Sequence, residues 1–194
     1  MTRGVVVHLD FTFVFLNAAC STHTQYPEES VLMQQRIINR VEGDPHYHQY
    51  LQSFNPKHDN TSAAAIILAA RQIARTVGAK AIVCFTVGGT TAQRASKKRP
   101  DVPILAISPL KETSRQLALS WGVYPEISGA NDYDTDNFRN MLSYACEIAL
   151  KKGLVADKKD LLVVTAGFPF GTPGAANIIR VIPAAGPTFW DSSL

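Results

Sequence analysis

A short run of small and hydroxylated residues, Thr86-Val87-Gly88-Gly89-Thr90-Thr91, is the segment of this sequence best suited to bind a ligand. Two adjacent glycines let backbone amides come close to a ligand, because no Cβ stands in the way. Three threonine hydroxyls add hydrogen-bonding groups. If a helix begins here, its free N–H groups and its dipole favour an anion, so the expected ligand carries a phosphate. The same residues also suit a turn that Thr90 caps and that binds nothing.

The second candidate is a loop of glycines, prolines and aromatic residues between residues 167 and 174. It follows a predicted strand, so it can fold over the first segment as a lid. A plain connection between two strands that binds no ligand is the alternative. The residues expected to contact the ligand are Gly167, Phe168, Phe170, Gly171, Thr172 and Gly174.

No set of residues predicts catalysis or metal binding. Ser120, His58 and Asp59 follow no recognisable order of a catalytic triad. Cys84 lies in an apolar run and is expected in the core rather than as a nucleophile. Three of the five histidines fall between residues 46 and 58, where we interpret them as solvated linker residues. We therefore expect no catalytic residue and no metal ligand in this chain.

The elements that must position these segments alternate between short apolar runs and helical patterns, which is typical of a parallel sheet covered by helices. About ten residues separate the last two predicted strands, whereas a parallel crossover needs a dozen or more, so the last strand should be antiparallel. The predicted fold is α/β, a three-layer αβα sandwich with a mostly parallel five-stranded sheet and a final antiparallel strand. The expected strands are 80–85, 103–108, 123–127, 160–166 and 177–182, and the expected helices are 27–41, 62–77, 90–99, 111–121 and 135–152.

Composition excludes some partners. The 194 residues carry a formal net charge of +3 with scattered cations, which does not suggest a nucleic-acid binder. The densest basic patch, 97–99, is interpreted as a solvated helix end. His8 and Asp10 interrupt the N-terminal apolar run, and no stretch of about 20 apolar residues exists, so we expect neither secretion nor a membrane partner. Three cysteines without metal-ligand spacing fit a reducing cytoplasm.

Several segments resemble, in order and spacing, the C-terminal domain of pyruvate kinases. The strongest matches are 80–92 (KAIVCFTVGGTTA), 99–108 (RPDVPILAIS) and 113–125 (TSRQLALSWGVYP). The resemblance continues through 152–154, 160–167 and 177–181. It implies four parts: a divergent N-terminal segment (1–24), a helix and linker like the end of the family's catalytic barrel (25–58), the C-terminal-like domain (59–185) and a tail (186–194).

The resemblance also implies that the chain is inactive on its own. The family's phosphotransfer between phosphoenolpyruvate and ADP takes place in a (β/α)₈ barrel, a fold of about 250 residues, which is longer than this chain. Mg and K belong to that barrel, so we expect no cofactor here. The family's Ser-Gly-Glu-Thr signature is replaced by residues 18–24 (AACSTHT). We expect a fragment or truncated form of a glycolytic pyruvate kinase.

The resemblance leaves regulation and assembly as the expected roles of this chain. In members of the family that sugar phosphates control, the loop matching Thr86, Gly88, Gly89, Thr90 and Thr91 holds the effector phosphate, and the late loop closes over it. Phe168 and Phe170 stand where animal enzymes have a Trp-Arg pair, so fructose 1,6-bisphosphate is not specified as the effector. A homo-oligomer through the last strand is expected. The alternatives are an oligomerisation module without a ligand and a part that is active only with a separate barrel chain.

Overall fold

The computed structural model describes residues 27–47, 60–129, 138–168 and 176–186. The chain divides into two compact units, Met1–His58 and Asp59–Leu194. Helix α2 (Pro27–Glu42) lies in the first unit. Two acids in its first turn and Arg40 in its last turn complement the helix dipole. The predicted helix is therefore present and ends one residue later than expected.

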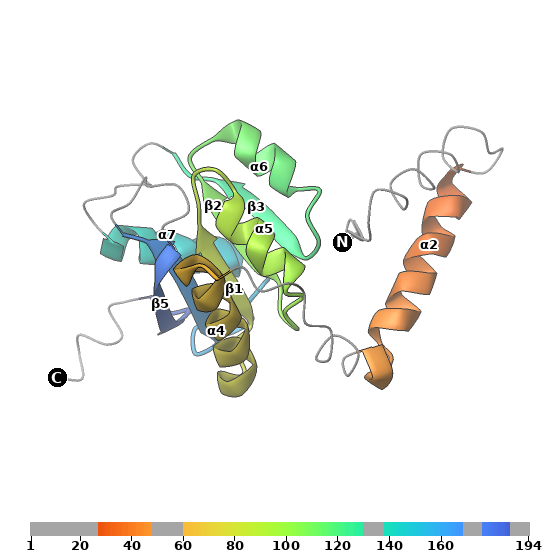
Figure 1. Ribbon diagram of the computed structural model, residues 1–194, viewed down its shortest axis with the longest axis horizontal. Helices are drawn as coiled ribbons and strands as arrows, with labels where there is room; N and C mark the ends of the chain where they lie inside the picture. Colours follow the sequence, from red (N-terminus) through yellow and green to blue (C-terminus); the bar gives the residue numbers. More distant parts are fainter. Residues whose placement is uncertain (1–26, 48–59, 130–137, 169–175, 187–194) are drawn as a thin grey trace. The chain divides into compact units, whose positions relative to one another are not determined.

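The second unit alternates helices and strands in the order expected (Figure 1). Its elements are α4 (Ser62–Val77), β1 (Ala81–Phe85), α5 (Thr90–Lys97), β2 (Ile104–Ser108), α6 (Lys111–Leu117), β3 (Val123–Ile127), α7 (Phe138–Lys151), β4 (Leu161–Gly167) and β5 (Ala176–Pro183). The strand order is β3-β2-β1-β4-β5. The first four strands are parallel, and β5 runs antiparallel to β4. The mostly parallel sheet with a final antiparallel strand is thus confirmed.

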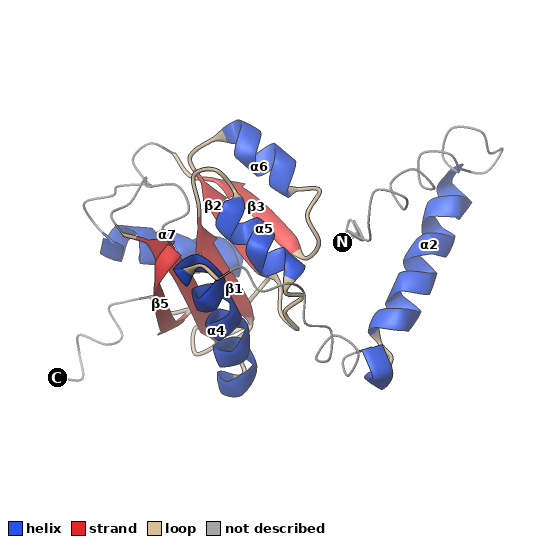
Figure 2. Ribbon diagram, in the orientation of Figure 1, coloured by secondary structure: helices blue, strands red, loops and turns tan. Residues whose placement is uncertain are grey.

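The sheet is the middle of three layers, as Figure 2 shows in red between blue helices. Helices α4, α5 and α6 pack on one face, against alternate residues of β1 and β2 such as Ile82 and Ile104. Helix α7 packs on the other face, against Val83 and Leu105. Every residue of β1 and β2 is buried, which is why these strands read as continuous apolar runs.

The helix ends explain where the predicted boundaries were right or wrong. Thr61 caps α4 by accepting a hydrogen bond from the Ala64 N–H at 3.3 Å, and Gly78 ends it in the left-handed region (φ +66°). The prediction that α6 reaches Trp121 was wrong. After Leu117 the backbone tightens into a turn, in which the Ser120 N–H bonds to the Leu117 carbonyl at 2.9 Å.

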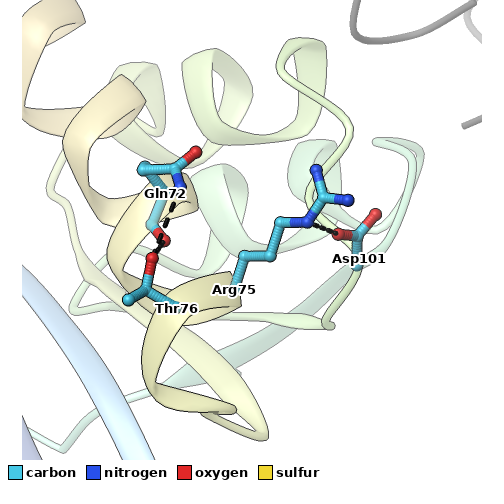
Figure 3. A network of polar contacts seen from close by, with 4 residues as sticks. All are labelled: Gln72, Arg75, Thr76 and Asp101. Carbon is cyan, nitrogen blue, oxygen red and sulfur yellow. Dashed lines mark hydrogen bonds and ion pairs between the residues drawn. The ribbon is translucent and has the colours of Figure 1, made fainter. Parts of the chain in front are cut away.

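The outer surface of α4 carries a small polar network (Figure 3). The Thr76 hydroxyl donates to the Gln72 carbonyl at 2.9 Å, and the Gln72 side-chain amide donates to Thr76 Oγ1 at 3.3 Å. Arg75 Nε lies 3.9 Å from Asp101 Oδ2, and both side chains are largely exposed. Exposed contacts of this kind contribute little to stability. Gln72 and Thr76 therefore offer control positions for the experiments below.

The basic patch is only partly a solvated helix end. Lys97 is exposed at the end of α5, as expected. The guanidinium of Arg99 instead lies over the Trp121 ring, 4.6 Å from its centroid, and Ser96 Oγ donates to the Trp121 carbonyl at 2.7 Å. These contacts fasten the end of α5 to the turn before β3. Among the described helices, none is both long and apolar enough to cross a membrane.

Candidate functional site

The two predicted segments begin at one edge of the sheet. From β1 the chain continues to β2 and β3 on one side, whereas β4 lies on the other side of β1. In a parallel sheet, ligands bind at the carboxyl ends of the strands where the order changes direction in this way. Cys84 of β1 pairs with Thr165 of β4, so Thr86 and Gly167 follow side by side at that edge. The topology thus brings the starts of both segments together.

The turn after β1 is held by its own first threonine. Thr86 is buried, and its hydroxyl oxygen accepts a hydrogen bond from the Gly89 N–H at 3.0 Å. Gly89 has φ +80°, and a Cβ added there would lie 3.2 Å from Thr113 Cγ2 and 3.4 Å from Leu117 Cδ2. Both the backbone angle and the close approach of α6 therefore require glycine at this position.

The outer side of the turn is open. Gly88 and Thr90 are exposed, and a Cβ added to Gly88 would meet nothing within 4 Å. The first helical bond of α5 joins the Gln93 N–H to the Gly89 carbonyl at 3.0 Å, which leaves the preceding amides at the helix start without an intrahelical acceptor. No acidic residue lies in the first turn of α5. The start of this helix can therefore attract a negatively charged group.

The five predicted phosphate-binding residues divide into two groups. Gly88 and Thr90 lie on the surface, whereas Thr86, Gly89 and Thr91 are buried within the turn. The hypothesis that Thr90 caps the helix was wrong, because the N-cap residue is Gly89 and no side chain caps this end. Thr90 is the first residue of the helix, so its exposed side chain is not engaged as a cap.

Sequence reasoning missed Ser108, the last residue of β2. Its hydroxyl donates to the Val87 carbonyl at 3.2 Å and accepts from the Leu110 N–H at 3.2 Å. One buried side chain thus fixes both the turn after β1 and the start of α6. The available signal was a polar residue at the carboxyl end of an otherwise apolar strand.

Of the late loop, the structure describes Gly167 and Phe168. Gly167 is partly buried, and Phe168 is 58% exposed. The Phe168 N–H donates to Asn177 Oδ1 at 2.8 Å, and Asn177 Nδ2 donates to the Phe168 carbonyl at 2.6 Å. Asn177 was not among the predicted site residues. The other predicted loop residues, Phe170, Gly171, Thr172 and Gly174, lie outside the described ranges.

Cys84 belongs to the core, as expected. Its thiol is fully buried, and burial raises its pKa to about 11, although a hydrogen bond from Thr165 acts in the opposite direction. A thiol with this pKa stays protonated at neutral pH and is a poor nucleophile. Cys146 is also buried and free. Within the described ranges, no three His, Cys, Asp or Glu side chains are grouped so that they could hold a metal ion.

Comparison with known proteins agrees with this architecture. The family described as "Pyruvate kinase, alpha/beta domain" matches residues 64–182. A pyruvate kinase from Agrobacterium vitis is 39% identical over 171 residues, which are 88% of this chain and 35% of the relative. A pyruvate kinase from Methylorubrum extorquens is 33% identical over 84% of this chain and 33% of the relative. One from Geobacillus stearothermophilus is 36% identical over 81% of this chain and 26% of the relative. The chain therefore spans about a third of the length of these relatives or less. On this evidence it belongs to the pyruvate kinase family and carries that family's C-terminal α/β domain.

Proposed function

We propose that this domain binds a phosphorylated effector at the turn after β1 and self-associates through β5. The observation that carries the first part is the open N-terminus of α5, with exposed Gly88 and Thr90 beside it. A phosphate needs several N–H and O–H donors and no nearby carboxylate, and the first turn of α5 contains no acid. Family membership supports this part of the proposal, because in family members that sugar phosphates control, the loop matching this turn holds the effector phosphate.

The second part of the proposal rests on the exposed edge of β5. The Ala184 N–H donates to the Asp160 carbonyl at 2.8 Å, so the backbone N–H and C=O groups of the even-numbered residues of β5 point toward β4. The backbone groups of Ile179 and Val181 then point away from the sheet, and the described residues supply no partner for them. Ile178, Ile179 and Val181 are half-buried on the two faces of the strand. A second copy of β5 would pair these groups and cover these side chains.

The opposite edge of the sheet is unsuited to this pairing. In β3 the backbone groups of the even-numbered residues form hydrogen bonds with β2. The backbone groups of Val123, Pro125 and Ile127 therefore point outward. The Val123 N–H already donates to the Ser120 carbonyl at 3.3 Å, and Pro125 has no N–H. The Tyr144 hydroxyl donates to the Ile127 carbonyl at 3.2 Å. Among the described strands, β5 is therefore the edge that favours assembly.

A thermal-shift titration tests effector binding. Fructose 1,6-bisphosphate, other sugar phosphates, nucleotides and inorganic phosphate would be compared on the native chain, Thr90→Val and the control Thr76→Val, which changes an exposed threonine of α4. A ligand at 100 times its dissociation constant stabilises a fold by about 2.7 kcal/mol. We expect one sugar phosphate to raise the midpoint of the native chain and of the control but not of Thr90→Val. No shift with any phosphate would contradict the effector function.

Two other functions remain as alternatives. If no phosphate binds but the chain is a dimer, assembly through β5 is the leading function. If pyruvate forms from phosphoenolpyruvate and ADP only after a separate barrel chain is added, the domain is one part of a divided kinase. The purified chain alone is expected to show no turnover, and measurable turnover would contradict that expectation.

A further inference from the structure

Asn177 occupies an irregular position in the sheet. Ala166 pairs with Ile178, but Gly167 pairs with Ala176, so Asn177 is an extra residue that has no paired residue on β4. Such a bulge bends the strand and turns the side chain of the extra residue in a new direction. Here it brings the carboxamide of Asn177 to the backbone of Phe168, the first residue beyond β4.

The carboxamide of Asn177 replaces one rung of the ladder. It has one carbonyl oxygen and one NH₂ group, the same groups that a peptide unit offers. Its oxygen accepts from the Phe168 N–H at 2.8 Å, and its nitrogen donates to the Phe168 carbonyl at 2.6 Å. The backbone of Phe168 is thus held at both of its polar groups, although the regular pairing of β4 with β5 has ended.

We infer that Asn177 is a positioning residue for the candidate site: it holds Phe168 at the carboxyl edge of the sheet, beside the strand that leads to the phosphate-binding turn. Its effect on ligand binding rests on the proposed function, whereas its hold on Phe168 does not. The side chain of Phe168 is 58% exposed, so it can contact a ligand once its backbone is fixed. Asn177 acts through Phe168 and does not itself bind the ligand.

Asparagine suits this role better than other residues do. Alanine would remove both bonds. Aspartate would keep the acceptor for the Phe168 N–H but lose the donor, and its second carboxylate oxygen would face the Phe168 carbonyl at close range. Asn177→Ala and Asn177→Asp are therefore the test variants. Gln72→Ala is the matched control, because it removes an exposed amide whose hydrogen bond stays within α4.

Two measurements test the inference on the whole chain. Hydrogen exchange of the Phe168 amide, followed by NMR, reports the hold on the backbone without any ligand. We expect about ten-fold faster exchange in Asn177→Ala and a smaller change in Asn177→Asp, which keeps the acceptor. Calorimetric titration with fructose 1,6-bisphosphate and with inorganic phosphate should show about ten-fold weaker binding in Asn177→Ala, if the competent arrangement falls to a tenth of the population. Gln72→Ala should match the native chain in both measurements.

The outcomes separate this inference from the proposed function. If the native chain binds neither of these two ligands and responds to no other phosphate in the thermal-shift titration, the effector function fails, while faster exchange at Phe168 still supports the hold by Asn177. If the native chain binds and Asn177→Ala binds equally well, the positioning role is overturned and the effector function stands. Unchanged exchange at Phe168 overturns the role in either case. Should Asn177→Ala not fold, Asn177→Asp decides by the binding titration alone, because it keeps the acceptor for the Phe168 N–H and loses only the donor to the Phe168 carbonyl; binding equal to that of the native chain then overturns the positioning role.

Discussion

The hydroxyl of Ser108 donates a hydrogen bond to the carbonyl oxygen of Val87, 3.2 Å away, and so joins the end of β2 to the turn after β1. It also accepts a hydrogen bond from the Leu110 N–H. Ser108 is fully buried, and both of its hydrogen bonds are part-buried, so loss of the hydroxyl removes two partly shielded hydrogen bonds at once.

Ser108→Ala should therefore lower the free energy of unfolding by about 1 to 3 kcal/mol, which is about 0.5 to 1.5 kcal/mol for each of the two hydrogen bonds lost. Urea denaturation followed by circular dichroism measures this change. Ser62→Ala, at an exposed serine of α4, is the control and should stay within about 0.5 kcal/mol of the native chain. Equal stability of the two variants would mean that the Ser108 contacts contribute nothing.

Gly89→Ala and Gly88→Ala form a second pair. Alanine at position 89 must adopt φ +80° and place its Cβ 3.2 Å from Thr113 Cγ2, so we expect a loss of about 1 to 2 kcal/mol from the backbone alone. Position 88 has open space and no positive φ, so Gly88→Ala should change stability by less than about 0.5 kcal/mol. The same urea titrations compare them, and similar losses at both positions would contradict the geometry of the turn.

Titration of the Cys84 thiol should lower the stability of the folded chain in alkali. Burial raises the pKa of its thiol from 9.0 to about 11, so between these values the folded chain holds a proton that the unfolded chain releases. Stability must then fall as pH rises through this window, by about 2 kcal/mol between pH 8 and pH 10.5 for this group. The slope of unfolding free energy against pH should be shallower in Cys84→Ala than in the native chain. Parallel slopes would show that Cys84 does not contribute.

Protonation of the Asp160 carboxylate should lower the stability of the folded chain in acid. Its Oδ2 accepts hydrogen bonds from the Asp157 N–H at 3.0 Å and the Ala156 N–H at 2.8 Å, and these bonds lower the pKa of the carboxyl group. The folded state therefore favours the ionised form, and its contribution is lost as pH falls below the ordinary range of the group. Thermal melts from pH 6 to pH 2.5 should show a smaller decline for Asp160→Asn. A decline identical to that of the native chain would contradict this.

Assembly through β5 is tested by removing one outward N–H. Val181→Pro deletes a donor that the twin strand would use, while Val181→Thr keeps it and serves as the control. Sedimentation at about 50 μM should give a dimer for the native chain and for Val181→Thr, and a monomer for Val181→Pro. A native monomer at this concentration, or a dimer of Val181→Pro, would exclude this edge as the interface. Circular dichroism would establish that each variant is folded.

The fold was predictable because its signals are local. Apolar runs such as 80–85 alternate with amphipathic segments, and the short connection before β5 requires an antiparallel strand. The end of α6 was not predictable, because the helical pattern continues past Leu117 while the backbone turns toward β3. Interruptions of this kind depend on where the next strand lies.

The position of the turn after β1 was predictable, whereas the arrangement of its side chains was not. Glycines and threonines after a strand mark the turn, but which hydroxyls face inward depends on backbone angles such as that of Gly89. Ser108 and Asn177 act through partners 21 and 9 residues away in the chain. No spacing rule in a single sequence identifies such pairs, because they form only when the strands are assembled.

The occupied edge of β3 limits how far this sheet can grow. A sheet with two open edges can add copies at both ends without limit and form a fibre. Here Pro125 and the Tyr144 hydroxyl close one side, so joining two β5 strands leaves a closed edge at each end of the combined sheet. If two β5 strands pair as proposed, the pairing therefore terminates after a single step, and the open strand carries no hazard of polymerisation.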